Sequence, residues 1–311
     1  MQRLAPRMTS PLPVLAVVGP TASGKSHLAL DVAERLGAEI VNADALQLYR
    51  GMDIGTAKLP LGERRGIQHH QIDVLDLRDE ASVAAYQRSA RADLAAVHSR
   101  GQPALFVGGS GLYVRAALDR LEIPPTDPMV RARLQGELET DGVDRLHQRL
   151  RELDPSAAAA IQARNGRRIV RALEVIELTG RPFSATMPRR EYLQPTRAIG
   201  LSVDRPALDQ RIERRVRRMW QDGLLAEVET LIGEGLREGR TASRALGYSQ
   251  AIAYLDGTLT AAAAQDETVT ATRRLARRQE SWFGPDPRIT WLPHDASDLL
   301  DQALALVGGD G

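Results

Sequence analysis

The sequence contains no cysteine. This absence excludes disulfide bonds and any zinc or iron–sulfur site held by thiolates. A chain without disulfides is typical of the reducing cytosol, so we expect a cytoplasmic protein. The sequence also lacks an apolar run of the roughly 20 residues that a membrane-spanning helix needs, so we predict no membrane segment. Residues 1–12 lack the apolar core of a secretory signal, and we expect them to be a disordered extension.

The sequence lacks a strong net charge, because 41 Lys and Arg residues face 40 Asp and Glu residues for a net charge of +1. The basic charge is clustered in the second half of the chain. Residues 164–171 and 273–278 each contain four arginines and no acid, and residues 205–220 contain six arginines against two acids. Such clusters are typical of faces that bind nucleic acid. A solvated basic face that pairs with acids elsewhere is the alternative.

Short apolar segments alternate with helical ones in the first 110 residues. Val14 to Val18 and residues 38–43 and 104–107 have the length and composition of buried strands. Residues 26–36 and 82–98 have helical spacing of their apolar positions. This alternation predicts an α/β fold in which helices cover both faces of a parallel sheet.

A phosphate-binding motif, G-x-x-x-x-G-K-[ST], follows the first predicted strand. The backbone N–H groups of such a loop point inward at an anion, and the next helix adds its positive end. We expect Lys25 to contact a terminal phosphate and the Ser26 hydroxyl to be a Mg²⁺ ligand. The motif predicts a diphosphate or triphosphate ligand held by Gly19, Pro20, Thr21, Ala22, Ser23, Gly24, Lys25 and Ser26.

The helical pattern changes after residue 121. Residues 122–196 have mainly helical periodicity, whereas 197–311 return to strands at 198–203 and 289–292, with helices at 206–236 and 260–283. We therefore predict a P-loop catalytic core formed by residues 13–121 and 197–311. A mainly α-helical insertion domain interrupts this core at 122–196.

The phosphate loop alone leaves four reaction classes open: ATPase, GTPase, small-molecule kinase, and transferase with a diphosphate leaving group. No guanine-reading Asn-Lys-x-Asp is present, and residues 104–107 lead into Gly108, Gly109 and Ser110 instead of an acid. These absences argue against a GTPase and weaken the case for a motor-type ATPase. Asp44 follows the second predicted strand, at the sheet edge where ligands bind. It could accept a proton, position a metal or cap a turn.

Several longer motifs occur in the order found in one known family. They are DALQLY at 44–49, GMDIGTAK at 51–58, HHQID at 69–73, GGSGLY at 108–113, RIVRALE at 168–174, GYSQ at 247–250 and TRRLARRQ at 272–279. With the phosphate loop they extend from about residue 14 to 292, nearly the whole chain. On these motifs the chain resembles the tRNA dimethylallyltransferase (tRNA isopentenyltransferase) family.

The resemblance implies transfer of a dimethylallyl group from dimethylallyl diphosphate to N6 of an adenine in tRNA. The adenine is the one on the 3′ side of the anticodon, in tRNAs that read codons beginning with U. The resemblance further implies Mg²⁺ as cofactor and the tRNA anticodon stem–loop as partner, and we expect a monomer. A P-loop kinase of a nucleotide or small metabolite is the alternative function, and an RNA-binding protein switched by nucleotide is a third.

The resemblance also assigns roles to single residues. Asp44 is the expected general base on N6, and Arg131 matches a residue at the active site. Ser110, where many members have Thr, keeps a hydroxyl for the diphosphate, whereas Ala45 replaces the usual Ser. The predicted tRNA contacts are Asp44, Ala45, Leu46 and Gln47 at the target base, and Arg167, Arg168, Arg171, Arg273 and Arg277 elsewhere. We expect Trp220, Trp282, Trp291 and Tyr248 to have packing roles.

Overall fold

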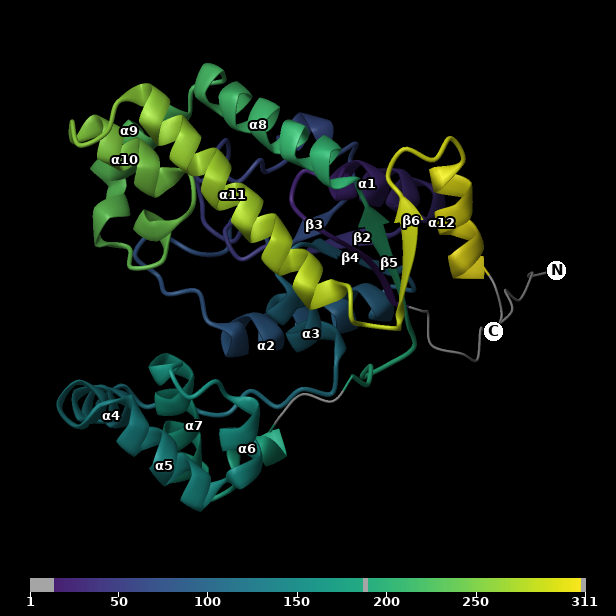
Figure 1. Cartoon of the computed structure of the whole chain (residues 1–311). Helices are drawn as coiled ribbons and strands as arrows, with labels where there is room; N and C mark the ends of the chain where they lie inside the picture. Colours follow the sequence, from purple (N-terminus) through teal and green to yellow (C-terminus); the bar gives the residue numbers. More distant parts are fainter. Residues whose placement is uncertain (1–13, 187–189, 309–311) are drawn as a thin grey trace. The chain divides into compact units, whose positions relative to one another are not determined.

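The computed structural model describes residues 14–186 and 190–308, which divide between two compact units (Figure 1). The first unit takes its described residues from the stretches up to Leu118 and from Tyr192 onward, and the second is Asp119–Glu191. The sequence placed these boundaries at 121/122 and 196/197. The expected extension at 1–12 lies outside the described residues. None of the helices in the described part of the chain has both the length and the apolar character needed to cross a bilayer.

The first unit is built on a six-stranded sheet in the order β3-β2-β4-β1-β5-β6, in which every neighbouring pair is parallel. The parallel sheet predicted from the sequence is therefore confirmed. The strands are β1 (Val14–Val18), β2 (Glu39–Asn42), β3 (His69–His70), β4 (Ala104–Gly108), β5 (Thr196–Ser202) and β6 (Ile289–Pro293).

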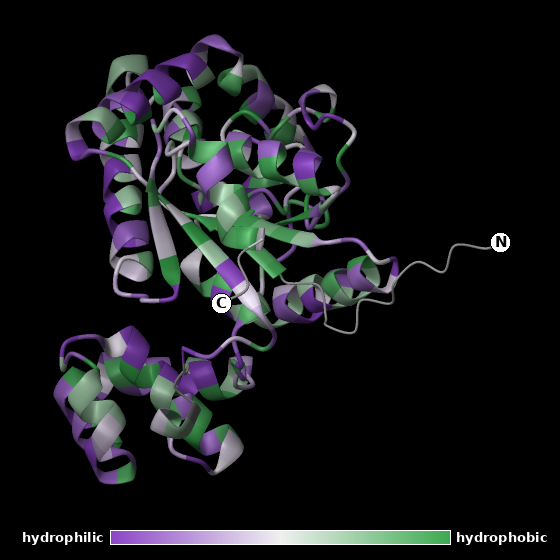
Figure 2. Ribbon diagram, turned by 90° about the vertical axis from the view of Figure 1, so that its right-hand side faces the viewer, coloured by the Kyte–Doolittle hydropathy of each residue, from purple (hydrophilic) through white to green (hydrophobic). Residues whose placement is uncertain are grey.

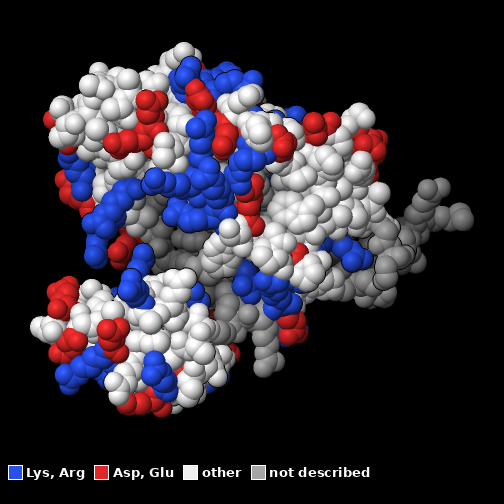
Figure 3. All heavy atoms as spheres, in the orientation of Figure 1, with Lys and Arg blue, Asp and Glu red and all other residues white. Residues whose placement is uncertain are grey.

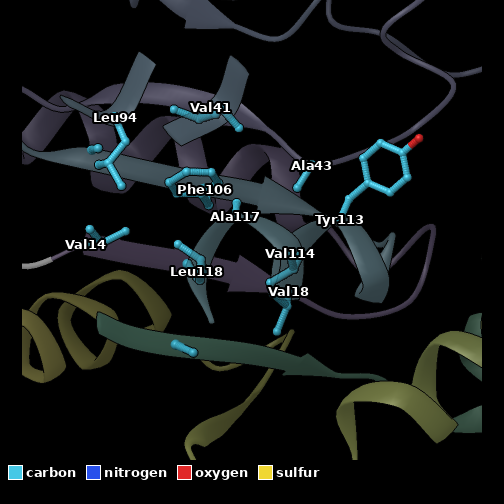
Figure 4. Close-up of a cluster of buried hydrophobic side chains, with 14 of the residues drawn as sticks. Val14, Val18, Val41, Ala43, Leu94, Phe106, Tyr113, Val114, Ala117 and Leu118 are labelled. Atoms are coloured by element: carbon cyan, nitrogen blue, oxygen red, sulfur yellow. The ribbon is translucent and has the colours of Figure 1, made fainter. Parts of the chain in front are cut away.

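The central strand is buried on both faces because helices cover each side of the sheet. Val14, Ala16 and Val18 of β1 belong to one hydrophobic cluster, whereas Leu15 and Val17 belong to another. The first cluster includes residues of α2 (Val83–Ser99) and α3 (Gly111–Leu118), and Figure 4 shows part of it. The second includes residues of α1 (Lys25–Leu36) and α12 (Leu299–Gly308). This two-sided burial explains the continuous apolar run of β1.

The helices after β5 differ in part from the prediction. The prediction of a single helix at 206–236 is wrong. Two helices occupy this stretch: α8 (Arg205–Gln221) and α9 (Leu224–Glu234), which is preceded by Gly223. Gly223 has φ of 105°, which interrupts a right-handed helix. The helix predicted at 260–283 is confirmed as α11 (Ala261–Phe283). Two further helices, α10 (Tyr248–Leu255) and α12, were not predicted from the sequence.

The second unit contains helices and no strand among its described residues, as its periodicity predicted. One hydrophobic cluster, with Leu134, Leu150 and Leu173 among its buried members, holds these helices together. Figure 2 shows hydrophobic and hydrophilic residues side by side along the helices, the pattern expected of helices with one buried face. The helices are α4 (Pro128–Asp141), α5 (Val143–Leu153), α6 (Pro155–Ala160) and α7 (Gly166–Thr179).

Candidate active site

Three loops of the first unit meet at the carboxyl edge of the sheet because β2, β4 and β1 are adjacent. The loop after β1 contains Thr21, the loop after β2 contains Asp44, and the loop after β4 contains Ser110. All three residues line one cavity of about 420 Å³. Helices α8 and α11 supply much of the remaining lining, including Ile212, Arg215, Val216, Met219, Thr268, Thr272, Leu275, Arg278, Gln279 and Trp282.

The close approach of the second and third loops requires glycine at position 108. A Cβ atom at Gly108 would lie 2.3 Å from the carbonyl oxygen of Ala43, which is far inside van der Waals contact. Across this contact the backbone N–H of Ala45 donates to the Ser110 hydroxyl oxygen at 3.3 Å. A hydroxyl that accepts a hydrogen bond still has its own hydrogen to donate. Ser110 is therefore positioned by Ala45 and retains a donor for a ligand oxygen.

Asp44 is held at the cavity by hydrogen bonds on both sides of its peptide unit. Asn42, which is buried, accepts from the Asp44 N–H and donates to the Asp44 carbonyl oxygen, each at 3.0 Å. The Asp44 Oδ1 atom accepts from the N–H of Leu46 at 3.0 Å. These contacts fix the carboxylate at the wall that it shares with the phosphate loop.

Lys25 begins α1 and carries the charge of the phosphate loop. Its Nζ atom donates to the carbonyl oxygen of Pro20 at 2.7 Å. Burial lowers the pKa of Lys25 to about 8; the negative charge of Asp44 opposes this shift, and the positive charge of Arg215 adds to it. The pKa of Lys25 therefore depends on the charges of both Asp44 and Arg215.

Three residues that shape this site were not predicted from the sequence. Gln279 of α11 accepts from the Thr21 N–H at 2.8 Å and donates to the Gly109 carbonyl oxygen at 3.0 Å, so it joins two of the loops. Arg211 of α8 donates to the Ala22 carbonyl oxygen at 2.8 Å. The third is Arg215. Its place with apolar residues on one helical face, at Ile212, Val216 and Met219, could have singled it out.

Arg215 is a partly buried cation in the lining of the cavity. Burial lowers the pKa of its guanidinium, and the charge of Asp44 opposes that shift. One of its nitrogens donates to the Thr56 carbonyl oxygen at 3.3 Å. Gln47, predicted to contact the target base, donates to the same oxygen at 3.2 Å. Ala45 and Leu46, its predicted companions, line the cavity.

The two arginines of α11 predicted to bind tRNA have different surroundings. Arg273 pairs with Glu213 at 3.2 Å and with Asp209 at 3.8 Å, both on α8, which is the structural alternative left open by the sequence. Arg277 is exposed, as are its neighbours Arg274 and Arg278. Figure 3 shows Lys and Arg side chains gathered on the face that α11 crosses.

The remaining predicted arginines belong to the second unit. Arg131 and Arg171 both pair with the fully buried carboxylate of Glu174, at 2.7 and 2.8 Å. Burial favours a raised pKa for Glu174, but the hydrogen bonds from these arginines outweigh it and the pKa lies below its usual range. Arg167 and Arg168 are exposed. Arg131 lies in the second unit, and its expected place at the active site stays a prediction.

The packing roles expected for the large aromatic residues are confirmed in part. Tyr248 is completely buried, and Trp291 packs against the hydrophobic cluster of β1. Trp282 packs against Gly111 but is not a core residue, because its surface is 47% exposed and it lines the cavity. Its position near the end of α11 leaves it at the rim, where only part of the indole is covered.

Comparisons with known proteins agree on one family. A family model described as "IPP transferase" matches residues 47–286, and one described as "Isopentenyl transferase" matches residues 12–73. A tRNA dimethylallyltransferase of Nocardioides sp. is 57% identical over 296 residues, which cover 95% of this chain and 96% of the relative. That of Thermobifida fusca is 59% identical over 299 residues, with 94% of each chain covered.

Two solved structures share the fold over most of the chain. The full-length tRNA isopentenylpyrophosphate transferase of Bacillus halodurans is 36% identical with a TM-score of 0.70, covering 95% of this chain and 96% of its own. A eukaryotic dimethylallyltransferase acting on tRNA is 25% identical with a TM-score of 0.79, covering 94% of this chain and 77% of its own.

Proposed function

This chain belongs to the IPP transferase family, and from that premise we propose that it transfers a dimethylallyl group from dimethylallyl diphosphate to tRNA. The acceptor is N6 of the adenine on the 3′ side of the anticodon in tRNAs that read codons beginning with U. The names of the relatives favour this reaction over the kinase alternative. A kinase would break a phosphorus–oxygen bond, whereas this reaction breaks a carbon–oxygen bond.

One observation carries the proposal: Asp44 and Thr21 of the phosphate loop line the same cavity. A diphosphate held by the loop and a purine facing the carboxylate would therefore meet in one cavity. Holding two reactants in this way converts a bimolecular step into a unimolecular one. Apolar residues of α8 and α11 in the lining suit the prenyl group.

The reaction assigns a separate task to each group. The lone pair on adenine N6 attacks C1 of the allylic group, the C1–O bond breaks, and the diphosphate leaves with the electron pair. The N6 proton passes to the Asp44 carboxylate. Lys25 and the backbone N–H groups at the start of α1 stabilise the charge that grows on the diphosphate. A single positioned donor of this kind contributes about 3–4 kcal/mol, or 10²–10³ in rate.

The donor set of the phosphate loop fits Mg²⁺. Among the described residues no three His, Asp or Glu side chains gather as a metal site, so a protein cage is not available there. Mg²⁺ commonly takes few protein ligands and completes its shell with phosphate oxygens and water. We propose that the Ser26 hydroxyl would hold it, and that the ion would neutralise charge on the leaving diphosphate.

For the tRNA partner we propose the anticodon stem–loop, bound by a monomer in the cytoplasm. A base must leave its stack to reach a buried diphosphate, and this costs least in a single-stranded loop. The exposed guanidinium groups of Arg277 and of Arg167 and Arg168 support the proposal because they are available for phosphate contacts.

The test is a mass measurement on defined substrates. The protein is incubated with dimethylallyl diphosphate, Mg²⁺ and an unmodified tRNA whose anticodon reads a codon beginning with U. We expect one added dimethylallyl group on the adenine beside the anticodon, located by nuclease digestion and mass spectrometry, with release of diphosphate. A parallel incubation with ATP in place of the prenyl donor tests the kinase alternative; ADP formation without an added prenyl mass would reject the proposal.

A further inference from the structure

The motif at residues 51–58 takes no direct part in the proposed reaction, but its backbone hydrogen-bonds to a carboxylate from a distant helix. Glu227 of α9 accepts hydrogen bonds from three consecutive backbone N–H groups, those of Asp53, Ile54 and Gly55, at 3.2, 2.7 and 3.4 Å. The hydroxyl of Tyr248 on α10 donates to the same carboxylate at 2.6 Å. Four neutral donors therefore converge on one carboxylate.

The side chain of Tyr248 closes this contact from the other side. A Cβ atom at Gly55 would lie 2.4 Å from the Tyr248 ring, so the ring packs directly on the glycine backbone. Tyr248 is completely buried, and burial followed by the charge of Glu227 raises the pKa of its hydroxyl. The tyrosine is therefore a neutral donor that both covers the loop and orients the carboxylate.

Lys58 fixes the other end of the same loop. Its ammonium group is buried and pairs with Asp53 at 2.6 Å and with Asp73 at 2.5 Å. It also donates to the Tyr49 carbonyl oxygen at 2.8 Å. The segment between Asp53 and Lys58 is thus held at both ends, and Thr56 lies between the two anchors.

Thr56 connects the anchored loop to the cavity. Thr56 and Gly55 line it, and the Thr56 carbonyl oxygen accepts hydrogen bonds from both Gln47 and Arg215. A shift of this carbonyl would displace the side chain predicted to contact the target base and the cation beside Asp44 together. The Glu227 carboxylate, which holds the adjacent residue, controls that carbonyl.

We propose that Glu227 is a positioning residue for the transfer reaction: by holding residues 53–55 it places Thr56, and through the Thr56 carbonyl it sets the positions of Gln47 and of Arg215, the cation that lines the cavity with Asp44. This role rests on the proposed function. It predicts that the acceptor side of the reaction depends on Glu227 more than the binding of the prenyl donor does, because Lys25 and Thr21 of the phosphate loop hydrogen-bond to Pro20 and Gln279 and not to the anchored segment.

The experiment compares E227A, E227Q and Y248F with E229A, a control on the same helix whose side chain is exposed. Displacement of a positioned group by about 1 Å can cost 10²-fold in rate. We expect kcat/KM for tRNA to fall about 10–100-fold in E227A and less in E227Q, which keeps one acceptor oxygen. The KM for dimethylallyl diphosphate should stay within about twofold, and E229A should match the wild type.

Amide hydrogen exchange on the same proteins separates this proposal from the proposed function. Faster exchange of residues 53–55 in E227A but not in E229A would show that the carboxylate holds the loop, whether or not prenylation is observed. Unchanged exchange of residues 53–55 in E227A would overturn the positioning role. So would an active wild-type enzyme together with equal kcat/KM values for tRNA in E227A and E229A. An inactive wild type would reject the reaction itself and the role with it. If E227A does not fold by circular dichroism, Y248F and E227Q decide the question.

Discussion

The backbone N–H of Thr21 in the phosphate loop donates to the side-chain oxygen of Gln279 at 2.8 Å, although 258 residues separate them. The nitrogen of the same side chain donates to the Gly109 carbonyl oxygen at 3.0 Å. Gln279 is buried, so water cannot easily replace either bond. The position of the phosphate loop relative to the loop after β4 therefore depends on α11.

Replacing Gln279 with Ala is expected to weaken both the fold and the donor site. The change leaves a loop N–H and a carbonyl oxygen without their partner, which costs about 1–3 kcal/mol for a buried group. We expect urea unfolding to show a loss of that size and kcat/KM for dimethylallyl diphosphate to fall about tenfold or more, since Thr21 is then free to move. T270A, an exposed change on the same helix, is the control. Equal kcat/KM values for dimethylallyl diphosphate in Q279A and T270A would show that Gln279 does not position the phosphate loop.

Replacing Asp44 with Asn tests the general base. The amide keeps an oxygen for the Leu46 N–H, so the local turn should persist, but it cannot accept the N6 proton. We expect the single-turnover rate to fall about 10²–10⁴-fold, the usual contribution of a positioned base. The dissociation constant of unmodified tRNA should stay within about twofold. Near-normal turnover in D44N would assign proton removal to another group.

The pKa of Lys25 predicts how donor use depends on pH. Burial lowers this pKa from 10.5 to about 8, so the ammonium group loses its proton as the pH rises through 8. We expect kcat/KM for dimethylallyl diphosphate to be level below this pH and to decline above it, because the neutral amine no longer attracts phosphate. The K25R variant should lack the decline in whatever activity it retains, since arginine stays charged. A wild-type profile that stays level up to about pH 9.5 would contradict the lowered pKa.

The lowered pKa of Lys25 also makes stability depend on pH, but in the opposite direction from the use of the prenyl donor. The unfolded chain binds more protons than the folded one between pH 8 and 10.5, so the contribution of Lys25 to the free energy of unfolding increases as the pH rises through that window. Subtracting the unfolding free energies of a K25M variant from those of the wild type at each pH isolates this contribution.

Arg277 and Arg273 are expected to differ in tRNA binding. Arg277 is exposed, whereas Arg273 pairs with Glu213 and Asp209 of α8. Loss of one phosphate contact reduces the slope of log affinity against log salt by about 0.7–0.9. We expect R277A to weaken binding with a slope change of this size, and R273A to lower stability by up to about 1 kcal/mol with little change in slope. Equal effects of the two variants on the salt dependence would place Arg273 on the RNA as well.

The sequence by itself determined the elements whose signals are local. The strand at Val14 to Val18 could be predicted because a strand buried on both faces has a continuous apolar run, which is visible in the sequence without knowledge of the neighbouring strands. Residues 19–26 predict a phosphate loop because the motif and its strand–helix context are contiguous. The Ser82 cap of α2 is equally local, because its hydroxyl accepts from the Ala85 N–H three residues later. Family motifs in a fixed order then indicated the reaction.

Only the tertiary structure decided which distant residues complete the site. Gln279 reaches Thr21 and Glu227 reaches the loop at 53–55 because α11 and α9 pack beside loops far away in sequence. Periodicity places such residues on a helix face but does not identify the loop that the face contacts. The ion pairs of Arg273 with α8 were undecidable for the same reason. The neighbouring residues on α11 are also arginines, so the residue type does not distinguish them. Only the packing of α11 against α8 determines which arginine is paired and which are exposed.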